Sequence, residues 1–153
     1  MFRSDANPTL LGAWATHGTP AVPGGSPLTV APIDWRTTGG VLELVGVDAD
    51  GELHWGEWGA FQRSDPYRLV GSVRIDQSFR SACLTTVHRV AAVTANNAVH
   101  WLRATSGKLE TTAPPVKLAV PAAAVAVVAR PHAGEVAVVF ADGSAARVPV
   151  PGS

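Results

Sequence analysis

Three stretches of the sequence, VLELVGVDADGELHWGEW (41–58), VHRVAAVTANNAVHWLRA (87–104) and AGEVAVVFADGSAARVPV (133–150), align without a gap at a spacing of 46 residues. In each, a short apolar run is followed by a turn pair, Asp-Gly or Asn-Asn, and then by a second run. The apolar runs are long enough for a strand and too short for a helix. Asp-Gly and Asn-Asn tolerate the positive φ that a type I′ turn requires at both central positions. Each stretch therefore predicts a β-hairpin.

The first strand of each hairpin is apolar on both faces, so it must be covered on both sides. Covered hairpins that recur every 40 to 50 residues are typical of the blades of a β-propeller. Residues 33–37, 79–83 and 125–129, again 46 apart, are the expected innermost strands, and 61–71 the expected fourth strand of the first blade. The fold class predicted is all-β, a β-propeller-like array of about three four-stranded blades.

The repeat divides the chain into blades of approximately 28–73, 74–119 and 120–153 within a single domain, 1–153. The third hairpin is followed by only a few residues, and the segment FRSDANPTLLG (2–12) resembles FQRSDPYRLVG (61–71). We therefore expect residues 1–12 to complete the last blade. The stretch 13–27 is an insertion rich in Pro and Gly, which predicts a surface loop.

Three blades are too few for a closed ring, since propellers typically have four to eight. Two copies of the chain would give about six blades. The sequence therefore predicts a homodimer, or one part of a larger propeller assembled with other chains. The competing interpretation is that the sequence is a truncated piece of a longer protein.

Composition excludes several classes of partner. The 153 residues carry 12 Lys plus Arg and 12 Asp plus Glu, so the formal net charge is zero and no basic field is available to hold nucleic acid or an anionic membrane. Cys83 is the only cysteine, so an intrachain disulfide is impossible. The first residues include Asp5, Asn7 and Pro8 where a signal peptide would need an apolar run, and we expect a cytoplasmic protein.

Candidate binding residues are aromatic side chains and histidines. The repeated pairs His54-Trp55 and His100-Trp101 could line equivalent pockets between blades, where an indole stacks on a sugar and an imidazole bonds its hydroxyls. Trp55, however, shares strand parity with Leu53, which predicts that it points toward buried surface and packs blades together. The candidate ligand-binding residues are Trp14, His54, Trp55, Trp58, His100 and Trp101.

Neither catalysis nor metal binding is predicted. The five histidines lack the H-x-x-x-H or H-E-x-x-H spacing of a metal site, and no G-x-S-x-G elbow places a nucleophile. Asp48, Asp50 and Glu52 alternate in one copy only, so turn chemistry explains them better than a calcium loop. We expect no catalytic residue, no metal and no cofactor.

The segments ELVGVDADGELHWGEW (43–58) and RVAAVTANNAVHWLR (89–103) resemble the blade motif of bacterial and fungal sugar-binding propeller lectins. By that resemblance Trp55 and Trp101 occupy the aromatic position of the motif. The same motif occurs in propellers that serve as interaction scaffolds, including components of bacterial multi-protein systems. The function expected is a non-catalytic β-propeller scaffold for protein–protein assembly, and the alternative is a carbohydrate-binding, lectin-like propeller.

Overall fold

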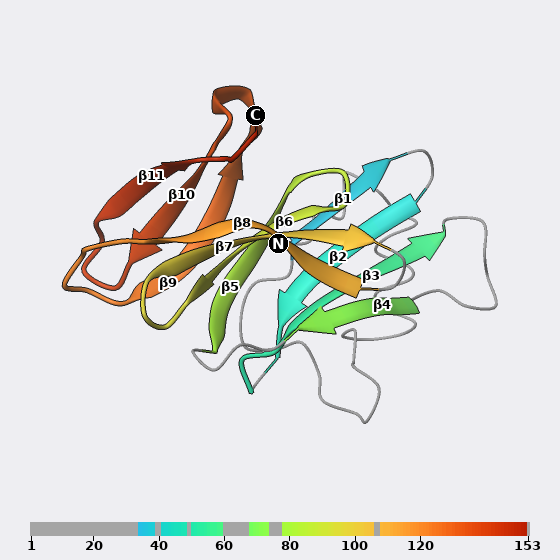
Figure 1. The fold of residues 1–153 in the computed structure, drawn as a ribbon, viewed down its shortest axis with the longest axis horizontal. Helices are drawn as coiled ribbons and strands as arrows, with labels where there is room; N and C mark the ends of the chain where they lie inside the picture. Colours follow the sequence, from blue (N-terminus) through green and yellow to red (C-terminus); the bar gives the residue numbers. More distant parts are fainter. Residues whose placement is uncertain are drawn as a thin grey trace.

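The computed structural model of the protein describes residues 34–38, 41–48, 50–59, 68–73, 78–105 and 108–152, which form three antiparallel sheets (Figure 1). We call these sheets blades 1, 2 and 3. Blade 1 contains β1 (Asp34–Thr38), β2 (Val41–Val47), β3 (Leu53–Gly59) and β4 (Arg68–Val73), and blade 2 contains β5 (Phe79–Thr86), β6 (Arg89–Thr94), β7 (Ala98–Thr105) and β8 (Lys108–Lys117). Blade 3 contains β9 (Ala124–Arg130), β10 (Glu135–Phe140) and β11 (Ala145–Pro149), with the short helix η1 (Pro131–Ala133) between its first two strands.

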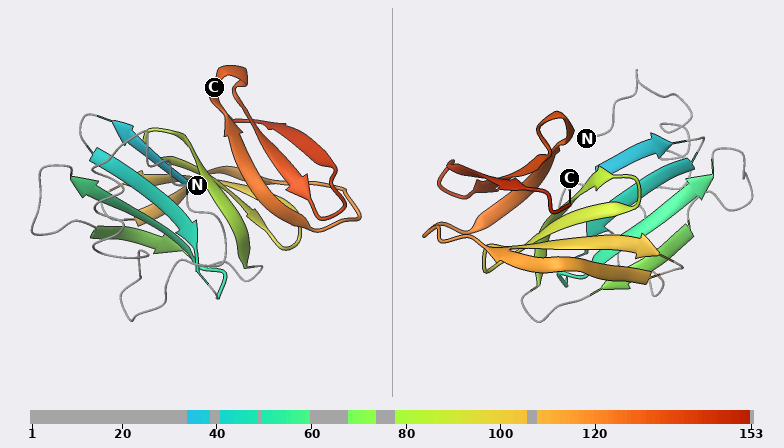
Figure 2. Two further views of the ribbon diagram at one scale, coloured as in Figure 1. Left: turned by 180° about the vertical axis from the view of Figure 1, so that it is seen from behind. Right: turned by 45° about the horizontal axis from the view of Figure 1, so that its top comes forward.

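The three sheets stand side by side in chain order, with blade 2 between the other two (Figures 1 and 2). Within each sheet the strands are also neighbours in chain order, so every blade is a meander. The innermost strand β5 contacts β9 on one side and β1 and β2 on the other. Of the residues described here, none belongs to a helix that is long and apolar enough to span a membrane.

The three predicted hairpins are confirmed as β2–β3, β6–β7 and β10–β11, but the predicted turn type is wrong. A type I′ turn needs positive φ at both central positions, whereas only the second residue of each turn pair has it: Gly51 (80°), Asn97 (62°) and Gly143 (87°). The N–H of these residues donates to the carbonyl three positions earlier, on Asp48, Thr94 and Phe140. The turns are therefore three-residue loops that end in a left-handed residue.

The innermost strands repeat less regularly than the hairpins. Ala91 of β6 pairs with Cys83, and its repeat equivalents Val45 and Ala137 pair with Asp34 and Val128. The predicted innermost strands 33–37, 79–83 and 125–129 are confirmed as β1, β5 and β9 to within a few residues, but their pairing with the second strand does not keep the spacing of 46. The reason is that the connection from the first to the second strand differs among blades, and blade 3 alone inserts η1 there.

Two apolar cores hold the blades together. The first lies between blades 1 and 2 and includes Val45, Leu53 and Trp55 with Leu84 and Leu102. The second lies between blades 2 and 3, where Val93, Val99 and Trp101 meet Val127 and Val138. Successive residues of a strand point to opposite faces, so the apolar strands of blade 2 contribute to both cores.

The fourth strand is present in two blades. β4 pairs with β3, which confirms the part of the predicted fourth strand that overlaps 68–71, and β8 pairs with β7. In the edge strand β8, Pro114 and Pro115 fall at a shift of the pairing register with β7, where the ladder hydrogen bonds are already interrupted. In blade 3 no described strand pairs with the outer side of β11. The predicted completing segment 1–12 and the loop 13–27 lie outside the described residues.

Candidate interaction surface

Trp55 packs at the junction of blades 1 and 2, as its strand parity predicted. Its side chain is only 3% exposed, and its indole Nε1–H donates to Oε2 of Glu43 at 3.2 Å. Glu43 is 2% exposed and also accepts from the backbone N–H of His88 in blade 2, at 3.2 Å to Oε2. The His88 ring meets Trp55 edge-on at a centroid distance of 5.6 Å. One buried carboxylate thus ties a strand of blade 1 to the first turn of blade 2.

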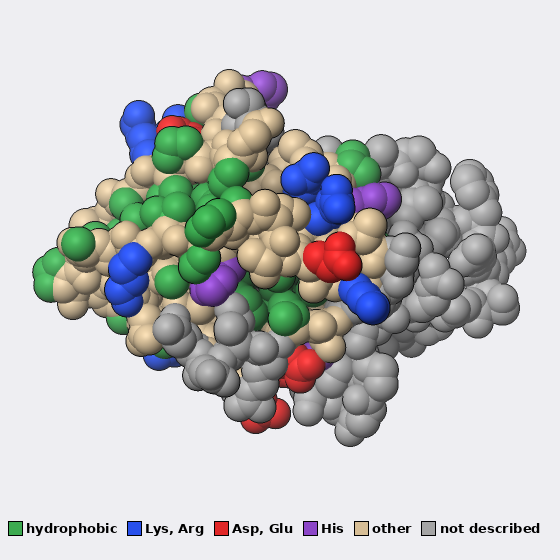
Figure 3. Space-filling model, viewed as in Figure 1, with side chains coloured by type: hydrophobic (Ala, Val, Ile, Leu, Met, Phe, Trp, Pro, Cys, Tyr) green, Lys and Arg blue, Asp and Glu red, His purple; other side chains and the backbone are tan. Residues whose placement is uncertain are grey.

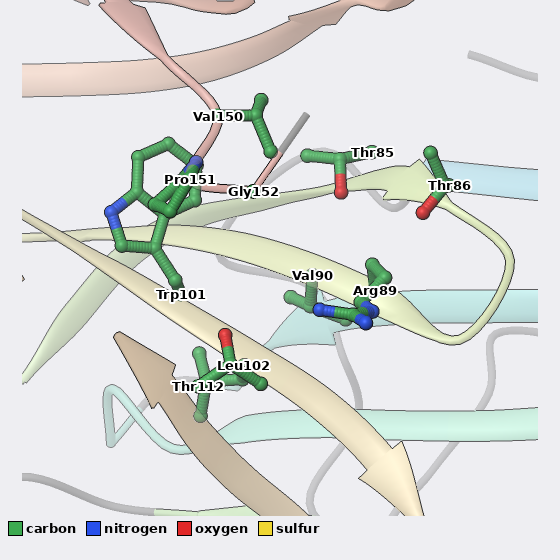
Figure 4. A pocket seen from close by; sticks show the side chains of 10 residues that line it. All are labelled: Thr85, Thr86, Arg89, Val90, Trp101, Leu102, Thr112, Val150, Pro151 and Gly152. Carbon is green, nitrogen blue, oxygen red and sulfur yellow. The ribbon is translucent and has the colours of Figure 1, made fainter. Parts of the chain in front are cut away.

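Trp101 occupies the equivalent position between blades 2 and 3 but lacks such a partner. It is 3% exposed, and its Nε1 has no hydrogen-bond partner among the described residues. Arg89 stands at the repeat position of Glu43, and a cation cannot accept the indole proton. A pocket of about 290 Å³ lies beside these two residues, and Figure 4 shows the indole nitrogen pointing away from Arg89. The remaining lining residues are Thr85, Thr86, Val90, Leu102, Thr112, Val150, Pro151 and Gly152.

His54 belongs to the turn of the first hairpin. Its Nε2 lies 2.8 Å from Oδ2 of Asp48, while Oδ1 of Asp48 accepts from the N–H groups of Asp50 (2.9 Å) and Glu52 (3.0 Å). Burial acts to raise the pKa of Asp48, but the hydrogen bonds from His54 and the two backbone groups outweigh it and hold this pKa below its ordinary value.

Ligand atoms of Asp48, Glu52 and His54 lie within 4.8 Å of one another, a grouping of metal-ligand types that the sequence analysis did not foresee. Both oxygens of Asp48 already accept hydrogen bonds within the turn. In blade 2 the hydroxyl of Thr94, at the position of Asp48, accepts from the N–H of Ala98 in the same way. The shared feature is therefore turn stabilisation, as the sequence predicted.

His100 packs against Phe79, a member of the core between blades 1 and 2. Its ring meets Phe79 edge-on at a centroid distance of 5.6 Å, and its Nε2 is buried without a hydrogen-bond partner. Burial lowers the pKa of His100, because the charged imidazolium would lose solvation without gaining an acceptor.

The remaining candidate residues are not placed by the structure. Trp14 lies outside the described residues, and for Trp58 only its position in β3 is described. A ligand-binding role for Trp14, His54, Trp55, Trp58, His100 and Trp101 stays a prediction. The burial of Trp55 and Trp101 matches the packing role, which leaves little of either indole face for a ligand to stack on.

In the first two turns, the second residue of the turn pair also contacts the following blade or the segment that leads to it. The carbonyl of Gly51 accepts from the N–H of Phe79, the first residue of β5, and a Cβ on Gly51 would lie 2.6 Å from Cβ of Ser78. The Asn97 side chain accepts from the N–H of Ala124 at 2.7 Å and donates to two carbonyls of the segment before β9. A Cβ on Gly143 would meet nothing within 4 Å.

The face of blade 3 that points away from blade 2 has an apolar centre, which no described strand covers. Buried Val136, Val138 and Phe140 of β10 point to blade 2, so Ala137 and Val139 between them point to the opposite face. We call this opposite face the forward face of blade 3. Its apolar members are Ala126, Val128, Ala137, Val139 and Ala145, and Arg130, Glu135, Arg147 and Pro149 complete it at one end.

The forward faces of blades 2 and 3 differ sharply in exposure. The equivalent residues of blade 2, Cys83, Ala91, Val93, Val99 and Trp101, are all at most 3% exposed. In blade 3, Val128 is 52% exposed. Figure 3 shows hydrophobic side chains gathered over this part of the molecule. Blade 3 therefore presents to solvent the kind of surface that blades 1 and 2 bury.

Comparison with solved structures identifies the architecture. The chain is similar to a chain of a mitotic checkpoint complex, with a TM-score of 0.56 and 13% identity over 77% of this chain and 36% of that one. It is also similar to the Cps50 (Swd1) β-propeller domain from Myceliophteria thermophila, with a TM-score of 0.52 and 17% identity over 74% of this chain and 39% of that one. The fold is that of part of a β-propeller.

These similarities concern the fold alone. The chain spans well under half the length of each of the two structures. No protein-family model matches the sequence, and no curated protein matches it. The predicted propeller class is confirmed, while the resemblance to sugar-binding lectins stays a prediction.

Substitutions can distinguish what Trp55 and Trp101 contribute to the stability of the two blade junctions. We expect Trp55→Ala and Trp101→Ala each to lower the free energy of unfolding by about 3–5 kcal/mol, because each removes a large buried ring. Trp55→Phe should be more destabilising than Trp101→Phe, because only the former deprives a buried carboxylate of a donor. Urea denaturation of the four variants measures this. Unchanged midpoints for both Ala variants would contradict the packing role.

His100 should make stability depend on pH. Because the folded-state pKa lies below the unfolded value near 6.5, the unfolded chain binds the proton more readily, and stability falls as pH drops below about 6.5. We expect His100→Leu to reduce the decrease in melting temperature between pH 7 and pH 5. The exposed His132 supplies a control, His132→Gln, which should keep the wild-type dependence. An identical dependence in His100→Leu and wild type would contradict the assignment.

Proposed function

We propose that this chain is a non-catalytic protein-interaction module that assembles with a protein partner through the forward face of blade 3. The observation that carries the proposal is the exposure of Val128, whose counterpart in blade 2, Cys83, is only 3% exposed. Covering a half-exposed Val contributes on the order of 1 kcal/mol, and the alanines and Val139 around Val128 add apolar area.

Two further features of the described residues support an interaction role. The second residue of the turn pair contacts the following blade in the first two turns, whereas at Gly143 no described residue makes such a contact. Arg147 stands where blades 1 and 2 have Trp, is 74% exposed, and lies 3.9 Å from the carboxylate of Glu135. An apolar centre bordered by a charged pair is the usual composition of a protein interface.

The surface fits a partner that presents another apolar sheet face like that of a blade. A second copy of the chain is such a partner, and this case can be tested directly. A six-blade assembly of two copies lies within the range that closed propellers occupy. The carbohydrate-binding alternative stays a prediction that rests on the resemblance of the hairpins alone.

The test is the solution mass of the protein. We expect wild type to weigh more than its 15.8 kDa monomer in light scattering at micromolar concentrations, and Val128→Glu to weigh 15.8 kDa without a change in melting temperature. Val87, 41% exposed in the turn between β5 and β6, supplies the matched control, and Val87→Glu should behave as wild type. A wild-type monomer at all concentrations would contradict assembly through a second copy.

A further inference from the structure

The pocket beside Arg89 and Trp101 lies between blade 2 and the segment that follows β11 (Figure 4). Its volume of about 290 Å³ is at the lower end of the range for small-molecule sites. Arg89 is the one charged residue of its lining, which combines hydroxyl groups with apolar side chains and contains no acidic residue. The pocket therefore has the composition of a site for a small organic anion.

Two β-bulges place hydroxyl groups in this pocket. The pairing register of β5 with β6 shifts at Thr85, and that of β8 with β7 shifts at Thr112, so each of these residues is extra in its strand. A bulge redirects the side chain of the extra residue, and bulges are frequent beside functional sites. Both threonines line the pocket. In blade 1, β1 pairs with β2 without a shift, and the extra residue of β4 is Val70, which has no hydroxyl.

The hydroxyl of Thr85 has unused hydrogen-bonding capacity. Thr85 is 8% exposed, and its hydroxyl forms no hydrogen bond with any described residue. Figure 4 shows this hydroxyl on the side of Thr85 that faces Arg89. A buried hydroxyl without a partner is unfavourable, so an acceptor atom placed between Thr85 and Arg89 would stabilise the site.

Arg89 supplies the positive charge. It stands directly opposite Arg103 of β7, and neither guanidinium forms an ion pair with a described carboxylate. Opposed residues of an antiparallel pair share a face, with Cβ atoms about 5 Å apart, and like charges there repel each other. In blade 1 the position of Arg89 belongs to Glu43, whose carboxylate lies buried at the junction with blade 2. The junction of blades 2 and 3 thus has a cation where the other junction has a carboxylate of the chain itself.

We propose that this pocket binds a small organic carboxylate that carries an apolar group. The carboxylate accepts two hydrogen bonds from the guanidinium of Arg89 and one each from the hydroxyls of Thr85 and Thr112. The apolar group lies against the ring of Trp101 and against Pro151. Trp101 contributes its ring and not its N–H, because its indole nitrogen points away from Arg89 (Figure 4).

The charge of the lining favours a carboxylate over a phosphate. A single lining cation balances a singly charged carboxylate, whereas a doubly charged phosphate would keep an unbalanced charge against apolar walls. The site lies between blades 2 and 3, and the forward face of blade 3 points away from blade 2. The proposal is therefore independent of the interaction role proposed for that face.

An NMR titration of the isotope-labelled protein with hydrocinnamate at pH 7 tests the site. This probe joins a carboxylate to a phenyl ring, and we expect it to bind with a Kd on the order of 1 mM, as is typical of a ligand of its size. The amide signals that shift should be those of the lining residues, Thr85 and Thr112 among them. Neutral hydrocinnamyl alcohol and inorganic phosphate should each bind at least about tenfold more weakly.

Substitutions identify the groups that hold the carboxylate. Arg89→Gln should weaken the binding of hydrocinnamate at least about tenfold, and Thr85→Val at least about threefold. Arg80, an exposed arginine of β5 that does not line the pocket, supplies the matched control, and Arg80→Gln should bind hydrocinnamate as wild type does. Should Arg89→Gln fail to fold, Thr112→Val, which removes only a hydroxyl at an exposed position, replaces it and should weaken binding at least about threefold.

Each other result overturns the proposal. Equal affinity for hydrocinnamate and its alcohol, or unchanged binding by the Arg89 variant, contradicts an anion site. Tighter binding of phosphate than of hydrocinnamate contradicts the assignment of a carboxylate. Amide shifts confined to residues outside the lining, or no shift at about 10 mM hydrocinnamate, contradict a ligand site in this pocket.

Discussion

A hairpin that is apolar on both faces cannot remain in water on either side, and this constraint organises the whole molecule. In blade 2 the constraint is met, because Val90 and Ala92 point into one core while Ala91 and Val93 point into the other. Each blade therefore depends on its neighbours for burial, as repeats in a stacked array do. At the end of the described array, blade 3 has the same two-sided pattern with only one side covered. The interaction role proposed for the protein is a consequence of that unmet requirement.

Polar groups make the two blade junctions different from each other. Between blades 1 and 2, the buried carboxylate of Glu43 accepts from both Trp55 and His88. Between blades 2 and 3, Arg89 replaces the carboxylate and the indole of Trp101 has no partner among the described residues. A different blade in the place of blade 2 would remove the His88 N–H from the buried carboxylate of Glu43 and leave it only the indole donor of its own blade, which is unfavourable. Such differences favour one order of blades over others.

The sequence predicted the parts of the fold that repeat. The shared hairpins and the parity of Trp55 with Leu53 follow from local patterns, and the structure confirms both. The predicted turn type was wrong, because the hairpin loops have three residues rather than two. The predicted spacing of the innermost strands was wrong in the register of their pairing, which differs among the blades. The role of Glu43 was missed, although a single carboxylate within the apolar run VLELV was a visible signal. Its partner His88 lies 45 positions away, and no local pattern links the two.

The central claim is that blade 2 is covered on both faces and blade 3 on one. Hydrogen exchange measured by mass spectrometry compares β6 and β10, since both are paired with a strand on each side and differ in how their faces are covered. In dilute solution we predict that amides of Arg89–Thr94 exchange at least about tenfold more slowly than those of Glu135–Phe140. Equal exchange in the two strands, or slower exchange in β10, would contradict the account.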